Sequence, residues 1–208
     1  SVAKLVILSG FAHILVLFSI MLFILDLQFA EVLVILLPKS KSLYIMIKKR
    51  VQLSAYCWIL SILSTILICG VFLYAKRQPH HEIAVWILWA TIVVLVAFTL
   101  FYMPLYIALD SDRLTIIRPL KSKSIPLPEI EEVKACNPTM GAKRIFGSGG
   151  WFGWYGLFRE DDLGKYFAYY GKASDCFLVT LKDGRKYMFG CQDSPEVLSV
   201  LTQKMKQR

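Results

Sequence analysis

Long uncharged stretches alternate with short basic segments over the first half of the chain. Residues 5–25, 51–75 and 83–103 each run for more than 20 positions without a Lys, Arg, Asp or Glu. A helix needs about 20 mainly apolar residues to cross the hydrocarbon core of a bilayer. Pro104 follows the third stretch and disfavours a longer helix. We therefore predict an α-helical membrane region over residues 1–104, with about three spans.

The first uncharged stretch can cross a membrane in two registers. A span over 5–25 leaves the following residues at the interface, whereas a span over 15–37 would place Asp26 and Glu31 inside the bilayer. Carboxylates inside a bilayer are costly, and where they occur they mark transport pathways. We favour 5–25, because it keeps both carboxylates out of the bilayer. The two later spans contain no charged residue, and three such spans are typical of an anchor.

Basic residues concentrate on one side of the predicted spans. The segment 38–50 carries Lys39, Lys41, Lys48, Lys49 and Arg50. We predict that this segment lies on the anionic cytoplasmic leaflet, where basic residues bind lipid headgroups. The loop at 76–82 has only two basic residues, and basic loops remain in the cytoplasm. We therefore expect a multi-pass protein of the cell inner (cytoplasmic) membrane, with the amino terminus outside and residues 105–208 forming a cytosolic domain.

The second half of the chain has the alternating pattern of short strands. We expect seven strands, at residues 105–109, 113–118, 123–127, 131–135, 165–171, 176–181 and 185–190. An Asp-Gly pair at 183–184 predicts a tight hairpin between the last two. Ser194 as N-cap and Pro195 in the first turn predict a C-terminal helix, with Val197 and Leu201 on one face. This order predicts a mainly-β barrel or sandwich capped by the helix.

A glycine- and aromatic-rich segment, GSGGWFGWYGLF at residues 147–158, lies between the expected strands. A dinucleotide-binding loop would need Gly at the position of Phe152 and a helix after it, so we exclude phosphate binding. The glycines permit tight turns, and the aromatic side chains either fill a core or enter the bilayer interface. The candidate interaction residues of this segment are Gly147, Gly149, Gly150, Trp151, Phe152, Trp154 and Tyr155.

The segment 147–158, the run LGKYFAYY at 163–170, the KDGRK hairpin and the closing Ser-Pro-Glu helix resemble the bacterial pleckstrin-homology-like (PH-like) domain family. The resemblance covers about residues 105–203. It implies a seven-stranded bent β-barrel with a C-terminal helix, often attached to membrane spans, and it implies no activity. Eukaryotic relatives that bind phosphoinositides use basic residues in the first hairpin loop. Here that turn is Asp110-Ser111-Asp112, so the resemblance supplies no ligand residues.

Charge and composition exclude several functions. The net charge of +9 divides into +5 for residues 1–109 and +4 for the rest, which fits membrane-flanking Lys and Arg rather than nucleic-acid binding. Five cysteines without a C-x-x-C pair indicate reduced, structural thiols. His13, His80 and His81 all precede the β-rich half, so we expect no Ser-His or Cys-His pair there. We therefore predict no catalytic residue, cofactor or metal, and a solvated Glu-Asp-Asp loop at 160–162.

Two functions fit these observations. The first is a membrane-anchored, non-catalytic interaction module that presents its cytosolic barrel to a protein partner or to itself. The alternative is a domain that binds or senses the lipid surface, with Trp151, Phe152, Trp154 and Tyr155 inserted and basic residues on anionic lipid. Both make the bilayer one of the partners of the protein.

Overall fold

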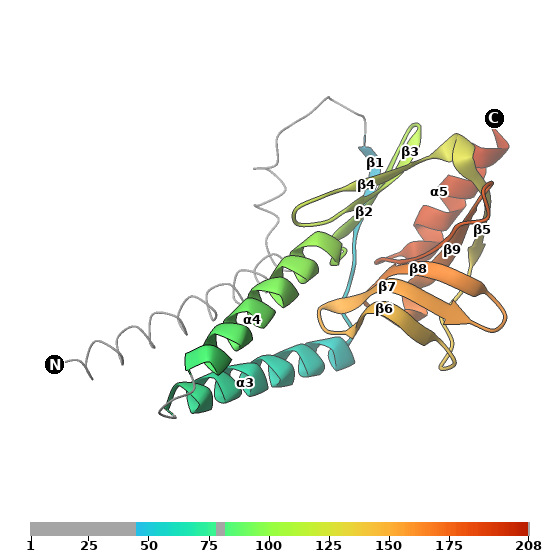
Figure 1. Ribbon diagram of the computed structural model, residues 1–208. Coiled ribbons are helices and arrows are strands. Elements are labelled where there is room, and N and C mark those ends of the chain that lie inside the picture. The colour runs from blue at the N-terminus through green and yellow to red at the C-terminus, as the bar shows by residue number, and fades with distance from the viewer. Residues whose placement is uncertain (1–44, 78–81, 208) are drawn as a thin grey trace. The chain divides into compact units, whose positions relative to one another are not determined.

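The computed structural model describes residues 45–77 and 82–207 (Figure 1). The first expected span, in either register, lies outside these residues, as do Lys39 and Lys41. The chain forms two compact units. Among the described residues, one unit contains 62–77 and 82–98, and the other contains 45–61 and 99–207.

Two helices match the second and third expected spans. They are α3 (Ala55–Arg77) and α4 (Glu82–Tyr102). Each is long and apolar enough to cross a membrane, and only 17% and 11% of their most apolar windows are buried, unlike the core helix of a soluble protein. In the first unit they pack through Phe72 and Ile92, and the Phe72 ring meets the edge of Trp89 at 5.8 Å.

A four-stranded antiparallel sheet takes one strand from before α3 and three strands from after α4. Its strands, in spatial order, are β1 (Ile45–Arg50), β2 (Tyr106–Asp110), β3 (Arg113–Ile117) and β4 (Lys123–Pro126). The first strand comes from the segment 38–50, for which we expected an interfacial position. Over 45–50 that segment forms a strand that we did not expect and pairs with β2. Its position at the membrane interface stays a prediction. The second unit, which we call the β-rich unit, therefore contains residues from before α3 and from after α4 in the chain.

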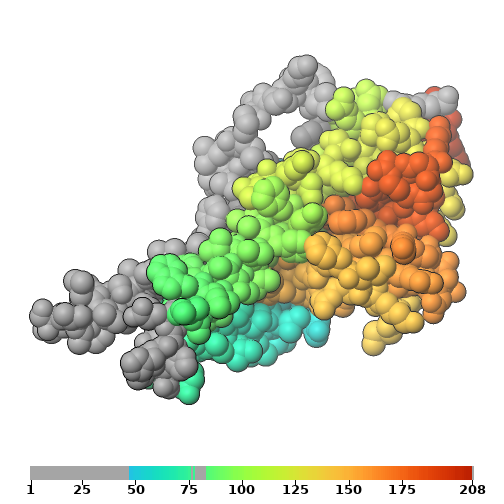
Figure 2. Space-filling view, viewed as in Figure 1, coloured from blue at the N-terminus to red at the C-terminus, as the bar shows by residue number. Residues whose placement is uncertain are grey.

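A six-stranded sheet makes up most of the second unit. Its strands, in spatial order, are β5 (Ile130–Ala135), β9 (Cys176–Leu181), β10 (Lys186–Gly190), β8 (Gly164–Tyr170), β7 (Gly153–Glu160) and β6 (Lys143–Gly150). All pairs are antiparallel except β8 with β10. Strands β6, β7 and β8 lie side by side and reach the surface together (Figure 1, Figure 2).

The seven expected strands are all present, each within one residue of its expected bounds. The described residues form ten strands in two sheets rather than seven in one barrel, because β1, β6 and β7 were not expected. Short 3₁₀ turns at Leu127–Glu129 and Ala173–Asp175 connect neighbouring strands. The mainly-β prediction is therefore confirmed.

The C-terminal helix, α5 (Ser194–Lys206), lies along β5 and β9 (Figure 1). It buries Val197 and Leu201, the apolar face that the sequence predicts. The expected N-cap was one residue too late, because Asp193 occupies that position in the left-handed conformation (φ 52°). The six-stranded sheet also carries an aromatic cluster, in which Tyr169 stacks on Phe189 with ring centroids 6.0 Å apart.

Candidate interaction surfaces

The expected interaction loop is a β-hairpin rather than an irregular connection. Gly147, Gly149 and Gly150 lie on β6, Trp151 and Phe152 form the turn, and Trp154 and Tyr155 lie on β7. Phe152 and Tyr155 are buried, and both Trp side chains are half-buried. The Trp154 ring stacks on Tyr170 at 6.0 Å and tilts against Phe158 at 5.9 Å. These aromatic side chains therefore pack within the protein.

The turn of this hairpin contacts the first two turns of α3. Phe152 has φ 52°, which is rare for a residue with a side chain, and its N–H donates to Ser61 Oγ at 2.9 Å. Ser61 Oγ donates in turn to the Cys57 carbonyl at 2.6 Å. A Cβ atom placed at Gly150 would meet Tyr56 and Leu60 at 2.9 Å. The hairpin turn is thus shaped to fit the beginning of this helix.

Two further groups of hydrogen bonds join the helix ends to the sheets. At the start of α3, Ser54 N–H donates to the Gly171 carbonyl at 3.0 Å, and the Cys57 thiol lies 3.5 Å from the same oxygen. At the end of α4, Tyr155 Oη donates to Thr99 Oγ1 at 3.3 Å. We call these contacts, together with Ser61 and Phe152, the helix–hairpin junction. They hold the start of α3 and the end of α4 within the second unit.

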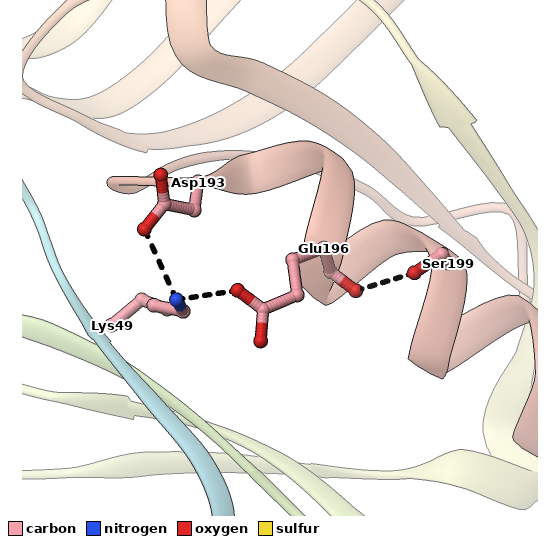
Figure 3. A network of polar contacts seen from close by, with 4 residues as sticks. All are labelled: Lys49, Asp193, Glu196 and Ser199. Carbon is pink, nitrogen blue, oxygen red and sulfur yellow. Dashed lines mark hydrogen bonds and ion pairs between the residues drawn. The ribbon is translucent and has the colours of Figure 1, made fainter.

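The described basic residues of β1 contact the protein itself. Lys49 Nζ forms ion pairs with Asp193 at 3.1 Å and with Glu196 at 2.5 Å, at the start of α5 (Figure 3). The hydrogen bonds that Lys49 donates to Glu196 and Asp193 raise its pKa. Lys48 Nζ lies 4.3 Å from the centre of the Tyr106 ring, and the Arg50 carbonyl accepts from Gln192 N–H at 2.8 Å. Strand β1 is therefore held to the start of α5 by charges, and to the turn before α5 by a backbone hydrogen bond.

The buried titratable groups favour structural roles. Burial raises the pKa of the Cys176 thiol, and it raises the pKa of Cys191 to about 12, so both are protonated and weakly nucleophilic at neutral pH. The described residues contain no cluster of three or more His, Cys, Asp or Glu side chains that could hold a metal ion. His13, His80 and His81 lie outside these residues.

One carboxylate of the expected solvated loop is buried. Glu160 ends β7 with 3% of its surface exposed, so the prediction of a solvated position was wrong for it. It accepts hydrogen bonds from Tyr166 Oη at 2.5 Å and from the N–H and hydroxyl of Thr139 at 3.2 and 2.8 Å. Asp161 and Asp162 are exposed, as expected. The Glu160 carboxylate holds the loop before β6 against the sheet.

A groove on the six-stranded sheet was not predicted from the sequence. Its apolar and aromatic lining includes Leu157, Phe167 and Tyr187, and its volume is about 360 Å³. Its other lining residues are Lys165, Tyr166, Asp183, Gly184, Arg185 and Lys186. Lys123 Nζ lies 4.2 Å from the centre of the Tyr187 ring and donates to its hydroxyl at 2.7 Å. We call this feature the sheet groove.

Three cations lie beside the sheet groove in a row across three strands. Lys143 of β6 pairs in register with Arg159 of β7, and Arg159 pairs with Lys165 of β8. We call these three residues the basic row. The alternating pattern of the sequence indicates which residues of β7 and β8 share a face of the sheet. It does not predict that Lys143 lies beside Arg159, because that pairing depends on the hairpin formed by the glycine-rich segment.

Comparison with protein families identifies the β-rich part of the chain. The model of a family described as Bacterial PH domain matches residues 105–208. The match excludes β1 and both long helices. Comparison with curated proteins and with solved structures found no match.

Proposed function

Because residues 105–208 are half of the 208, the chain belongs to the bacterial PH domain family, and we propose that it is a membrane-anchored interaction module. PH-like domains are generally non-catalytic. In this proposal α3 and α4 cross the cell inner membrane, and the β-rich unit is presented in the cytosol to a protein partner or to itself.

The observation that carries this proposal is the pairing of β1 with β2. Lys49 pairs in register with Ile107, and the N–H of Val51 donates to the Leu105 carbonyl at 2.9 Å. The chain that enters α3 and the chain that leaves α4 therefore belong to one sheet. A helical pair that crosses a bilayer twice returns its two ends to the same side, as this sheet requires. Basic residues flank both ends, which supports a cytosolic position.

A protein partner is better supported than the lipid surface. Lipid insertion of the hairpin would require aromatic side chains that are free to leave the protein, whereas Phe152 and Tyr155 are buried. The carboxylates of Asp193 and Glu196 engage Lys49, so this cation is not available for lipid phosphates. The lipid alternative therefore depends on other basic residues, and photo-crosslinking to lipid would reveal it.

Site-specific photo-crosslinking of the full chain in membranes tests the proposal. A photoreactive residue replaces Met140, which is fully exposed beside β6, and in a second variant it replaces Trp86, which is 72% exposed on α4. We expect discrete protein adducts from position 140 and lipid adducts from position 86. Lipid adducts at position 140 would favour the lipid alternative, and no adduct there in membranes would contradict the proposal.

A C-terminal reporter fusion tests the orientation independently. A fluorescent protein that matures only in the cytosol should fluoresce when fused after Arg208, and a phosphatase that folds only outside should be inactive there. The opposite pair of results would place the β-rich unit on the other side of the membrane.

A further inference from the structure

We propose that the basic row and the sheet groove together bind an acidic, extended segment of a partner protein. This inference rests on the proposed function, because it assigns a surface and a partner chemistry to the anchored module. The basic row is Lys143, Arg159 and Lys165, and the apolar lining of the groove includes Leu157, Phe167 and Tyr187.

The stability of the sheet does not explain why three cations lie side by side in the basic row. Residues in register on neighbouring strands project from the same face, and like charges in that position destabilise the pair. All three side chains are exposed, and among the described residues none of them forms an ion pair with a carboxylate. Asp161 and Asp162 lie in the turn after Arg159 without pairing to the row. The uncompensated charge is therefore available to an anion from outside.

The sheet groove supplies the apolar half of the site. Lys165 belongs to both features, so the row leads directly into the groove. Other cations at the groove have partners within the protein: Arg185 pairs with Asp183 at 2.6 Å, and Lys186 donates to the Leu163 carbonyl at 2.8 Å. The groove thus offers apolar contact area, while the basic row offers free positive charge.

The row lies at the end of the hairpin that does not meet α3. Gly150 lies at the end that meets α3, whereas Lys143 lies seven strand positions away, about 23 Å at roughly 3.3 Å per residue. In the groove, Phe167 stacks on Tyr102 at the end of α4, with ring centroids 6.3 Å apart. The row and the groove together offer positive charge and apolar area, which suit an acidic protein segment that also carries apolar side chains.

The dimensions suit a short extended segment. Two strand spacings of about 4.8 Å separate Lys143 from Lys165, so the row is about 10 Å long. Three or four residues of extended chain cover this length, and alternate residues face the same side. Carboxylates on one end of such a segment would contact the row, while an apolar side chain further along would enter the groove.

The test uses the full chain in nanodiscs of neutral phosphatidylcholine. The probe is a fluorescent peptide of alternating glutamate and leucine, its control is the same peptide with glutamine, and fluorescence anisotropy measures binding. We expect the glutamate probe to bind at low salt and the glutamine probe to bind at least tenfold more weakly. Arg159→Glu and Lys165→Glu should each weaken the glutamate probe about tenfold or more, because they replace attraction by repulsion.

Lys134→Glu is the matched control, because Lys134 is exposed on β5, the opposite edge of the same sheet, and the net charge changes equally. It should alter binding less than twofold. Equal losses in the Lys134 and Arg159 variants would overturn the proposal, as would unchanged binding in the Arg159 variant. Binding of anionic phosphatidylglycerol nanodiscs through the row, without peptide binding, would also overturn it. The melting temperature of Arg159→Glu should not fall, which separates lost binding from unfolding.

Failure of this inference is distinguishable from failure of the proposed function. Suppose that wild type forms protein adducts from position 140 in membranes and that Arg159→Glu leaves them unchanged. This result would support the proposed interaction module and contradict the inference that its partner is acidic. If wild type forms none, the proposed function itself is wrong.

Discussion

Gly147 and Gly156 lie opposite each other in register across the β6–β7 hairpin, and neither position has room for a Cβ atom. A Cβ atom at Gly147 would lie 2.1 Å from the Tyr155 carbonyl oxygen, and one at Gly156 would lie 2.2 Å from the Phe146 carbonyl oxygen. Both glycines have positive φ, +119° and +124°. The hairpin that meets α3 therefore depends on two facing glycines.

Gly147→Ala should destabilise the β-rich unit strongly. The added methyl group collides with backbone atoms that cannot move without breaking the hairpin, and the positive φ is strained as well. We expect a loss of about 2–4 kcal/mol in the free energy of unfolding. Gly164→Ala is the matched control, because its φ is +72° and the space around it is open, so we expect a loss of about 1 kcal/mol. Equal losses in urea unfolding would contradict the steric argument.

Ser61→Ala should weaken the helix–hairpin junction. Its hydroxyl accepts a hydrogen bond from the N–H of Phe152, and Ser61 is only 1% exposed. Without the hydroxyl, this buried N–H would have no partner. An unpaired buried donor costs about 1–3 kcal/mol. Thr91→Ala is the control, since the Thr91 hydroxyl also donates to a helix carbonyl, Ile87 at 2.9 Å, but is exposed on α4. Thermal unfolding in nanodiscs should give a lower melting temperature for Ser61→Ala than for Thr91→Ala. A comparable drop in melting temperature in both variants would argue against a stabilising role of the junction.

The sequence predicts elements whose signal is local. Helices α3 and α4 form where two of the spans were expected, and each expected strand alternates or ends at a turn residue. The family resemblance over residues 105–203 is confirmed by the family match over residues 105–208. These predictions succeed because hydropathy and turn chemistry act within a few residues of the chain.

The missed elements depend on distant partners. Strand β1 has the basic composition of an interfacial segment, and only its pairing with β2, across two helices, makes it a strand. The glycines of β6 and β7 disfavour a strand locally, yet they allow the close approach seen at Gly147 and Gly156. The basic row depends on the register of three strands, and the sheet groove also involves the parallel pairing of β8 with β10. Such relationships are not visible in a local pattern.

The stability of the β-rich unit should fall in alkaline solution. Burial raises the pKa of Cys191 from 9.0 to about 12, and it raises the pKa of Tyr169 from 10.0 to about 12. Between pH 9 and 12 the unfolded chain therefore releases protons that the folded protein retains, so rising pH favours unfolding. This stabilisation is complete below pH 9 and is lost toward pH 12, at no more than about 1.4 kcal/mol per pH unit for each group.

Melting temperatures of the full chain at pH 8, 9, 10 and 11 measure this effect. Cys191→Ala should make the decline shallower, because one of the titrating groups is removed. A melting temperature that stays constant from pH 9 to 11 would show that the thiol and phenol protons are not retained by the folded state.

Neutralising the centre of the basic row should stabilise the protein. Arg159 lies in register between Lys143 and Lys165, so Arg159→Gln removes two like-charge contacts. Each such contact costs a few tenths of a kcal/mol, and we expect a gain of about 0.5–1 kcal/mol in the free energy of unfolding. For a chain of this size that gain raises the melting temperature by about 1–4 °C. The gain should shrink as salt screens the exposed charges.

Lys134→Gln is the control for this change, because Lys134 pairs in register with the uncharged Leu178 and should give no gain. A lower melting temperature for Arg159→Gln, or a gain that is independent of salt, would mean that Arg159 stabilises the sheet by another contact. A salt-sensitive gain in stability, combined with weaker binding of the glutamate probe, is the result expected of a charge that is retained for a partner. A residue that only packed on the surface would not lose binding while the fold became more stable.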